Sequence, residues 1–125
     1  MANEINMQVC LSIQRANLNV AGMANELISP AGTRASQNQI TVTTGAFSAN
    51  AITLIDGSTS AGYLFVKNTD PTNFVQLALD SAGAKVFAKL RKLECCLVPL
   101  VDSTTQIYAQ ANTASVSIIV VAAQA

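Results

Sequence analysis

The chain has 125 residues, of which half are hydrophobic and only 11% are charged. The length suits a single domain over residues 1–125, and the charged share lies well below the ~25% that is typical of soluble domains. Seven basic and seven acidic residues cancel, and no basic run is interleaved with aromatic residues, which argues against a nucleic-acid partner. Histidine is absent, which excludes Ser-His-Asp and Cys-His catalysis and the commonest transition-metal ligand.

The amino-terminal residues Met1–Glu4 carry no positive leader and precede no apolar signal region. The longest uninterrupted apolar stretch, Ile118–Ala123, is far too short to span a bilayer. We therefore expect no membrane partner. No Gly-rich phosphate-binding motif is present either, so we expect no enzyme activity and no cofactor.

Alternating apolar and mostly polar residues from Ile5 to Ile13 predict a half-buried β-strand with one apolar face. A second short strand is expected at Asn17–Val20. The stretch Gly22–Ser36 contains Gly, Ser and Pro and is interpreted as a long loop or arm, with a possible helical turn at Met23–Ile28.

The rest of the chain reads as short strands separated by turns, such as Asp56-Gly57 and Ser81–Gly83. Asn68–Pro71 predicts a reversal in which Asn68 and Asp70 bond to nearby backbone. The expected strands are Gln39–Thr44, Ala51–Ile55, Gly62–Val66, Phe74–Asp80, Val86–Leu90, Leu93–Leu100, Gln106–Ala111 and Ser115–Val121. A helix over Ala82–Lys92 is the alternative for that segment. This spacing predicts an all-β single domain, a β-sandwich or jelly roll with one long loop near residues 22–36.

The three cysteines are Cys10, Cys95 and Cys96. Adjacent strand residues point to opposite faces, so Cys95 and Cys96 are poorly placed to bridge each other. We expect reduced thiols that fill the core, with a bridge from Cys10 to one of the pair left open. Three cysteines without C-x-x-C spacing cannot build a four-ligand zinc site within one chain, so no metal is expected.

The carboxylates are expected to bond to local turns rather than to form a catalytic pair; they are Asp56, Asp70, Asp80, Glu94 and Asp102. Aromatic residues of the strands, Tyr63, Phe65 and Tyr108, are expected in the core. Basic residues cluster between Lys85 and Lys92, either as a solvated surface or as a docking patch for an acidic neighbouring protein. Arg34 is interpreted as a contact residue or as a solvated one.

The terminal strands favour self-assembly. Ser115–Val121 has high β-propensity, no charge and no proline, so an exposed edge there would recruit another chain and should be paired and covered. The candidate assembly-interface residues are Met7, Val9, Leu11, Arg34, Lys85, Lys89, Arg91, Lys92, Ile119 and Val121.

The segment Gly62–Leu77, with Leu97–Leu100 and Ile107–Ala114, resembles a strand–turn–strand pattern of small virion proteins of tailed bacteriophages. The similarity covers roughly Gly62–Val121 and departs at Lys89–Cys96, where a Gly-Glu turn is expected. The resemblance implies a β-sandwich subunit made in the host cytoplasm that decorates (cements) the capsid surface. Its implied partners are further copies of itself, in a homotrimer, and the major capsid protein.

Two alternatives stay open. The same fold would serve a tail, collar or head-fibre component. A carbohydrate-binding jelly roll is the other alternative, and the absence of Trp argues against it.

Overall fold

The computed structural model describes residues 5–16, 18–28, 32, 34–101 and 103–125. We expected one domain, and the chain divides into two compact units, residues 1–33 and 34–125. Each unit is described by itself. Asn17, which begins a predicted strand, and Asp102, one of the carboxylates considered above, lie outside the described residues.

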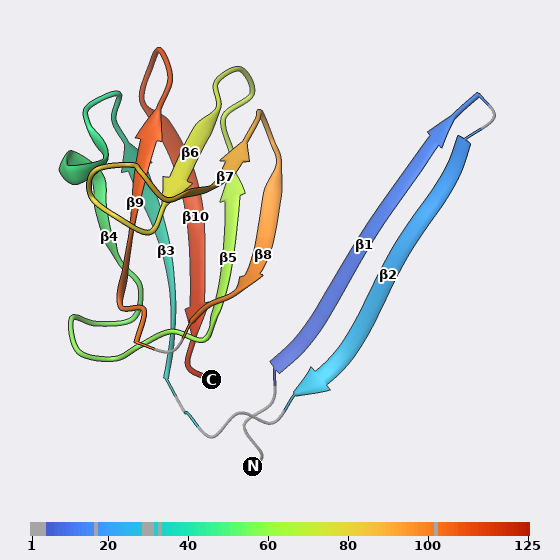
Figure 1. The fold of residues 1–125 in the computed structure, drawn as a ribbon, viewed down its shortest axis with the longest axis horizontal. Helices are drawn as coiled ribbons and strands as arrows, with labels where there is room; N and C mark the ends of the chain where they lie inside the picture. Colours follow the sequence, from blue (N-terminus) through green and yellow to red (C-terminus); the bar gives the residue numbers. More distant parts are fainter. Residues whose placement is uncertain (1–4, 17, 29–31, 33, 102) are drawn as a thin grey trace. The chain divides into compact units, whose positions relative to one another are not determined.

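The smaller unit is a two-stranded antiparallel hairpin (Figure 1). Strand β1 (Ile5–Arg15) pairs with β2 (Leu18–Ile28) in continuous register, from Arg15 opposite Leu18 to Ile5 opposite Ile28. Ala16, after β1, has a φ of 40°, the positive φ that two-residue hairpin turns require. The strand predicted at Ile5–Ile13 is confirmed.

The long loop predicted at residues 22–36, with its helical turn at Met23–Ile28, is wrong over most of its length. Residues 22–28 continue β2, and the next strand already begins at Ala35. The cause is pairing with the preceding strand, because the backbone of β2 forms hydrogen bonds with β1 regardless of its side chains. The residues of β2 that share a face with the apolar side chains of β1 include Gly22, Ala24 and Glu26, so β2 lacks the apolar alternation that marks a strand.

The larger unit contains two four-stranded antiparallel sheets (Figure 1). One has the order β3 (Ala35–Val42), β10 (Val116–Ala123), β5 (Tyr63–Asn68), β8 (Cys95–Pro99). The other has the order β4 (Ala51–Thr53), β9 (Gln106–Ala111), β6 (Val75–Ala78), β7 (Val86–Leu90), and a 3-10 turn, η1 (Phe47–Asn50), precedes β4. The all-β prediction is confirmed, and the alternative helix over Ala82–Lys92 is wrong because that segment contains β7.

One hydrophobic core takes side chains from both sheets. In β10 every second residue is buried, and the members from this strand are Val116, Ile118, Val120 and Ala122. From the other sheet come residues such as Leu77, Ile107 and Ala109, all at 0% exposure. Period-two burial is what the alternating sequence predicts for strands with one covered face.

The carboxy-terminal strand is not an edge of its sheet. β10 pairs with β3 on one side and with β5 on the other. The prediction that Ser115–Val121 is paired and covered therefore holds within the unit, and this strand offers no free backbone edge for a neighbour.

Two predicted reversals are present as expected. The Asn68 side chain accepts a hydrogen bond from the Asp70 amide at 2.9 Å, and the Asp70 carboxylate accepts from the amides of Thr72 and Asn73 at 2.7 and 2.6 Å. In the Ser81–Gly83 turn, Gly83 has a φ of +72°, and a Cβ there would lie 2.4 Å from the ring of Phe47. Only glycine meets both conditions without strain.

Candidate functional site

One side of the hairpin carries the apolar residues of β1. Directly opposite residues of an antiparallel pair share a face, so the register puts these residues on one side: Ile5, Met7, Val9, Leu11, Gly22, Ala24 and Glu26. Val9 is 47% exposed and Leu11 65% exposed, while Met7 is half-buried. The strand was predicted to be half-buried, and Val9 and Leu11 on its apolar face are exposed. We call these seven residues the hairpin face.

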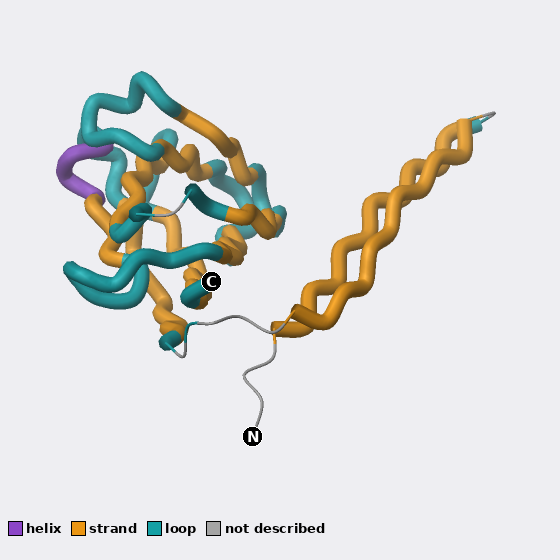
Figure 2. Tube along the Cα trace, turned by 60° about the horizontal axis from the view of Figure 1, so that its bottom comes forward, coloured by secondary structure: helices purple, strands orange, loops and turns teal. Residues whose placement is uncertain are grey.

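The opposite side of the hairpin is mixed. β1 contributes the polar residues Asn6, Gln8 and Ser12 with Cys10, whereas β2 contributes Met23 and Leu27, at 81% and 63% exposure. The two strands twist about each other (Figure 2), and a shallow depression on the ribbon is bordered by Gln8, Val9, Cys10, Met23, Ala24 and Asn25. Its lining carries no carboxylate and no basic group, so the depression offers little chemistry.

A second apolar surface lies on the outer side of the β3–β10–β5–β8 sheet. Ile119 and Val121 of β10 point away from the core and are half-buried. Val121 is opposite Phe65, which in turn is opposite Leu97. These four residues, which we call the outer patch, partly cover one another. The sequence pointed to Ile119 and Val121 but missed Phe65 and Leu97, because register across strands is a tertiary property.

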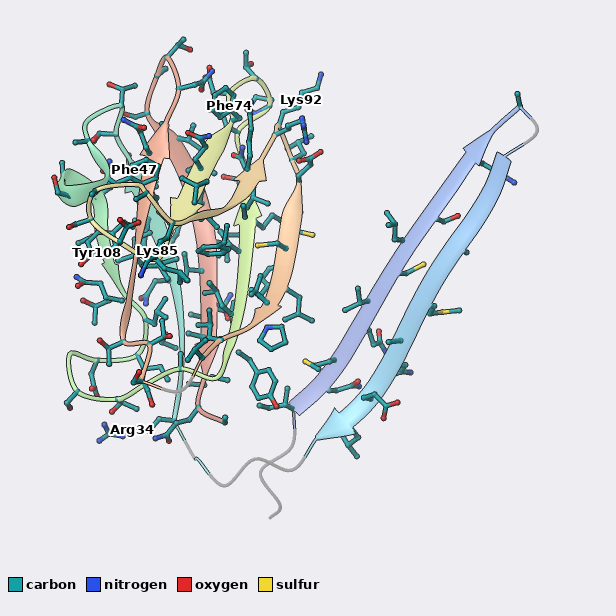
Figure 3. All side chains as sticks on the ribbon, viewed as in Figure 1. Arg34, Phe47, Phe74, Lys85, Lys92 and Tyr108 are labelled. Atoms are coloured by element: carbon teal, nitrogen blue, oxygen red, sulfur yellow. The ribbon has the colours of Figure 1, made fainter. Side chains whose placement is uncertain are left out.

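The four clustered basic residues do not form one compact patch. Lys85 precedes β7, whereas Arg91 and Lys92 follow it, so they lie at opposite ends of the strand (Figure 3). Lys89 places its Nζ 4.0 Å from the centroid of the Phe74 ring, a cation–π contact. Arg91 pairs with Glu94 at 3.7 Å. All four side chains are exposed, which agrees with the solvated-surface interpretation, and docking to an acidic neighbour stays a prediction.

Arg34 is held within its own unit. Its Nη1 lies 2.5 Å from Asp56 Oδ2 and donates to Thr59 Oγ1 at 2.8 Å. The backbone amide of Arg34 also donates to the Gln124 side chain at 3.2 Å, and its carbonyl accepts from the Gln124 amide. Arg34 therefore joins the start of β3 to the loop after β4 and to the end of the chain. An exposed ion pair of this kind contributes about 0–1 kcal/mol.

Asp56 is the most strongly hydrogen-bonded carboxylate of the described chain. It accepts from the amides of Ser58 and Thr59 at 2.9 and 2.6 Å and from both hydroxyls. The Ser58 amide, followed by the Thr59 hydroxyl, lowers the pKa of Asp56 to about 2. The Asp70 pKa is also lowered, by the amides of Asn73 and Thr72. Charged carboxylates are thus part of the folded loops.

Acid is expected to destabilise the larger unit between about pH 4 and pH 2. The folded-state pKa of Asp56 is about 2 against an ordinary 3.8, so its contribution is complete above the unfolded value and is lost as pH falls through the folded value. Urea unfolding of Asp56→Asn should show a smaller loss of stability over this window than the parent protein. Thr59→Val, which keeps the carboxylate and removes one donor, should fall between the two. If the stability of Asp56→Asn fell with pH as steeply as that of the parent protein, the prediction would be contradicted.

The local role predicted for the carboxylates is confirmed for the four that are described. Asp56 and Asp70 cap their own loops, Asp80 accepts from the amides of Ala84 and Lys85, and Glu94 accepts from the amide of Arg91. Within the described residues, no three His, Cys, Asp or Glu side chains are grouped so that they could hold a metal ion.

The cysteines and aromatic residues occupy more exposed positions than predicted. All three thiols are free; Cys10 and Cys95 are exposed and Cys96 is half-buried, where burial raises its pKa. Core filling is therefore wrong for Cys10 and Cys95. Their positions on the hairpin and on β8 explain why, because both point away from packed side chains. Tyr63, Phe65 and Tyr108 are likewise half-buried on outward positions of their strands and do not belong to the core.

The turn between β7 and β8 carries a residue that the sequence did not single out. Leu93 has a φ of 61° and is 58% exposed. A positive φ is uncommon for a bulky side chain. Its backbone amide bonds to the Asp70 carbonyl at 3.3 Å, so the tight turn around Arg91–Glu94 imposes the conformation. An apolar pattern in the sequence carries no signal of this.

No protein-family model, curated protein or solved structure matches this chain. Across the described part of the chain, no helix has the length and apolar character needed to cross a membrane. The candidate functional features are therefore surfaces: the hairpin face and the outer patch.

Proposed function

We propose that this chain is a structural, non-enzymatic protein of a tailed-bacteriophage virion, and that it acts as a capsid decoration protein. The observation that carries the proposal is the hairpin face, an apolar surface with Leu11 65% exposed on a separate unit of the chain. Such a surface on a protein with few charges is suited to permanent contact with other subunits.

The strand pairing of the larger unit supports a jelly-roll fold for that unit. Its strands pair in nested order, β3 with β10, β4 with β9, β5 with β8 and β6 with β7, all antiparallel. This is the pairing of one long hairpin rolled into two four-stranded sheets, an arrangement found in viral capsid and lectin domains. Fold alone does not define function, so the virion role rests on the hairpin face and on the resemblance of Gly62–Val121 to small phage virion proteins.

The proposal assigns a contact to each of these surfaces. The hairpin face supplies apolar area for other copies, and the outer patch with Ile119 and Val121 supplies a second, half-buried apolar surface for the major capsid protein. The exposed basic residues around β7 would orient the subunit on an acidic capsid surface, since rim charges set orientation and association rate more than affinity.

The test uses heads of the phage that encodes the chain, prepared without this protein. Purified protein is expected to bind expanded heads at a saturating, fixed number of copies, and immunogold particles should label heads. An Ile119→Lys Val121→Lys variant should bind more weakly, whereas Ser48→Lys Ala49→Lys, at exposed positions of η1, serves as the matched control. Absence of binding to heads overturns the decoration role. Label confined to the tail would assign the chain to a tail, collar or fibre, and glycan-array binding would favour a carbohydrate-binding module.

A further inference from the structure

The hairpin is built like a part of a larger sheet. Its eleven-residue strands form a sheet of their own, so each has one edge whose N–H and C=O groups face no other described strand. Between Ile5 and Ile28 the only charged residues are Arg15 and Glu26, and there is no proline. Natural edge strands are usually blunted by charge, proline or a bulge, and an isolated two-stranded hairpin is marginally stable at best in water. This one needs partners for its edges and for its face.

A single face-to-face contact between two hairpins cannot provide partners for both the edges and the face. A two-stranded ribbon of eleven residues is roughly 36 Å long and 10 Å wide, so one face offers roughly 360 Å². A stable interface of standard size buries about 800 Å² on each partner. Face-to-face packing of two hairpins would therefore fall short, and it would leave all edges unpaired.

At two of its layers the hairpin face pairs a large residue with a small one. Val9 of β1 lies opposite Ala24 of β2, and Leu11 lies opposite Gly22. A Cβ added at Gly22 would meet nothing within 4 Å, and the position has no positive φ, so neither space nor backbone conformation within the chain requires glycine there. The small residue is consistent with a contact made outside the hairpin. Alternation of large and small side chains is what the interior of a small barrel needs.

We propose that the hairpins of three copies of this chain close into a six-stranded antiparallel β-barrel with the hairpin face inside. Strand β2 of each copy pairs with β1 of the next, and because β1 and β2 are themselves antiparallel, the ring closes with all pairs antiparallel. Closure satisfies every edge and buries Val9 and Leu11. This inference rests on the self-assembling role proposed above and specifies its partner.

The number of copies follows from the side chains. Eight strands make a barrel whose interior is just filled by side chains, but two of the seven residues of the hairpin face are Gly22 and Ala24, which leave less volume to fill. Six strands, from three copies, match this reduced volume, whereas four strands would be too few to enclose Leu11 and Val9. Met23 and Leu27, on the opposite side of the ribbon, would lie outside the barrel.

Glu26 is the charged residue of the hairpin face, opposite Met7 and one layer from the Ile5 end. In the barrel three Glu26 carboxylates meet near that open end and repel one another. Glu26→Gln is therefore expected to tighten association about threefold or more, with the larger effect at low salt. Weaker association of Glu26→Gln would contradict the inward position of this residue.

The experiment measures the mass of the full chain by light scattering and sedimentation from about 1 to 100 µM, because assembly depends on concentration. The expected mass is about three times 13.0 kDa. Leu11→Asp should be monomeric at all concentrations, whereas Ser12→Asp, its neighbour on the other side of the ribbon, should remain trimeric. Gly22→Val should weaken association at least about tenfold by overpacking the interior, although valine favours strands in a single chain.

NMR cross-peaks of residues 34–125 should be unchanged in all variants, which shows that the larger unit remains folded. A monomeric or dimeric parent protein, a trimeric Leu11→Asp variant or tighter association of Gly22→Val would each overturn the barrel. These results are separable from the test of function. A trimer that fails to bind heads overturns the decoration role alone, and a monomer that binds heads overturns the barrel alone.

Discussion

Replacing Asn68 by alanine is expected to lower the free energy of unfolding of the larger unit by about 2–4 kcal/mol, because several partners lose a buried hydrogen bond at once. The side chain is 0% exposed. Its Nδ2 donates to the carbonyls of Asn73, Leu90 and Arg91 at 2.8, 3.1 and 3.0 Å, and its Oδ1 accepts from the Asp70 amide. One side chain thereby joins the end of β5 to the segment before β6 and to the end of β7.

Asn68→Asp is expected to cost more than Asn68→Ala near neutral pH, since a buried carboxylate would face three carbonyl oxygens and could donate to none of them. Asn38→Ala, on an exposed position of β3, is the matched control and should change stability by less than about 0.5 kcal/mol. Urea unfolding with a constant m-value measures all three variants. A wild-type midpoint for Asn68→Ala would mean that these carbonyls are hydrated without it.

Alanine substitutions of the neighbouring isoleucines Ile118 and Ile119 of β10 are expected to differ sharply in their cost to stability. Ile118→Ala should cost about 2–5 kcal/mol, because it opens a cavity in a packed core. Ile118 is 0% exposed and lies opposite Ile40 on one side and Asn68 on the other. Ile119→Ala should cost about 1 kcal/mol or less, since this half-buried side chain points to the outer patch and loses only part of its contacts.

Thermal and urea unfolding of the two variants provides the comparison, with the parent protein as the reference. Equal costs for Ile118→Ala and Ile119→Ala would contradict the assignment of inner and outer faces to β10. The same pair separates stability from assembly, because Ile118 lies in the core whereas Ile119 belongs to the surface proposed for capsid contact.

Several elements were predictable because local chemistry decides them. Gln106–Ala111 was predicted with the same bounds that β9 has, and Val86–Leu90 with those of β7. Alternating side chains identify a half-covered strand, and Asn, Asp and Gly mark reversals through their own short-range hydrogen bonds or conformations. The same reasoning correctly gave the local turn roles of Asp56, Asp70 and Asp80.

Other elements depended on partners far along the chain. Residues 22–28 were taken for a loop because Gly22, Ala24 and Glu26 interrupt the apolar pattern, yet register with β1 makes them a strand. The sequence likewise predicted that Ser115–Val121 is a strand that would recruit another chain if its edge were exposed. It did not predict that this strand lies between β3 and β5. Pairing on both sides is what leaves that strand without a free backbone edge.

By itself, the sequence determined that this protein is built from β-strands, that the strands other than β2 fall within a few residues of their observed bounds, and that Met7, Val9 and Leu11 share an apolar face. Period-two patterns and turn residues carry that information locally. Only the tertiary structure decided that β10 lies inside a sheet, that Arg34 pairs with Asp56, and that Val9 and Leu11 lie opposite Ala24 and Gly22. Those outcomes depend on which distant segments meet, and hydrogen-bond pairing between strands sets this independently of the local pattern.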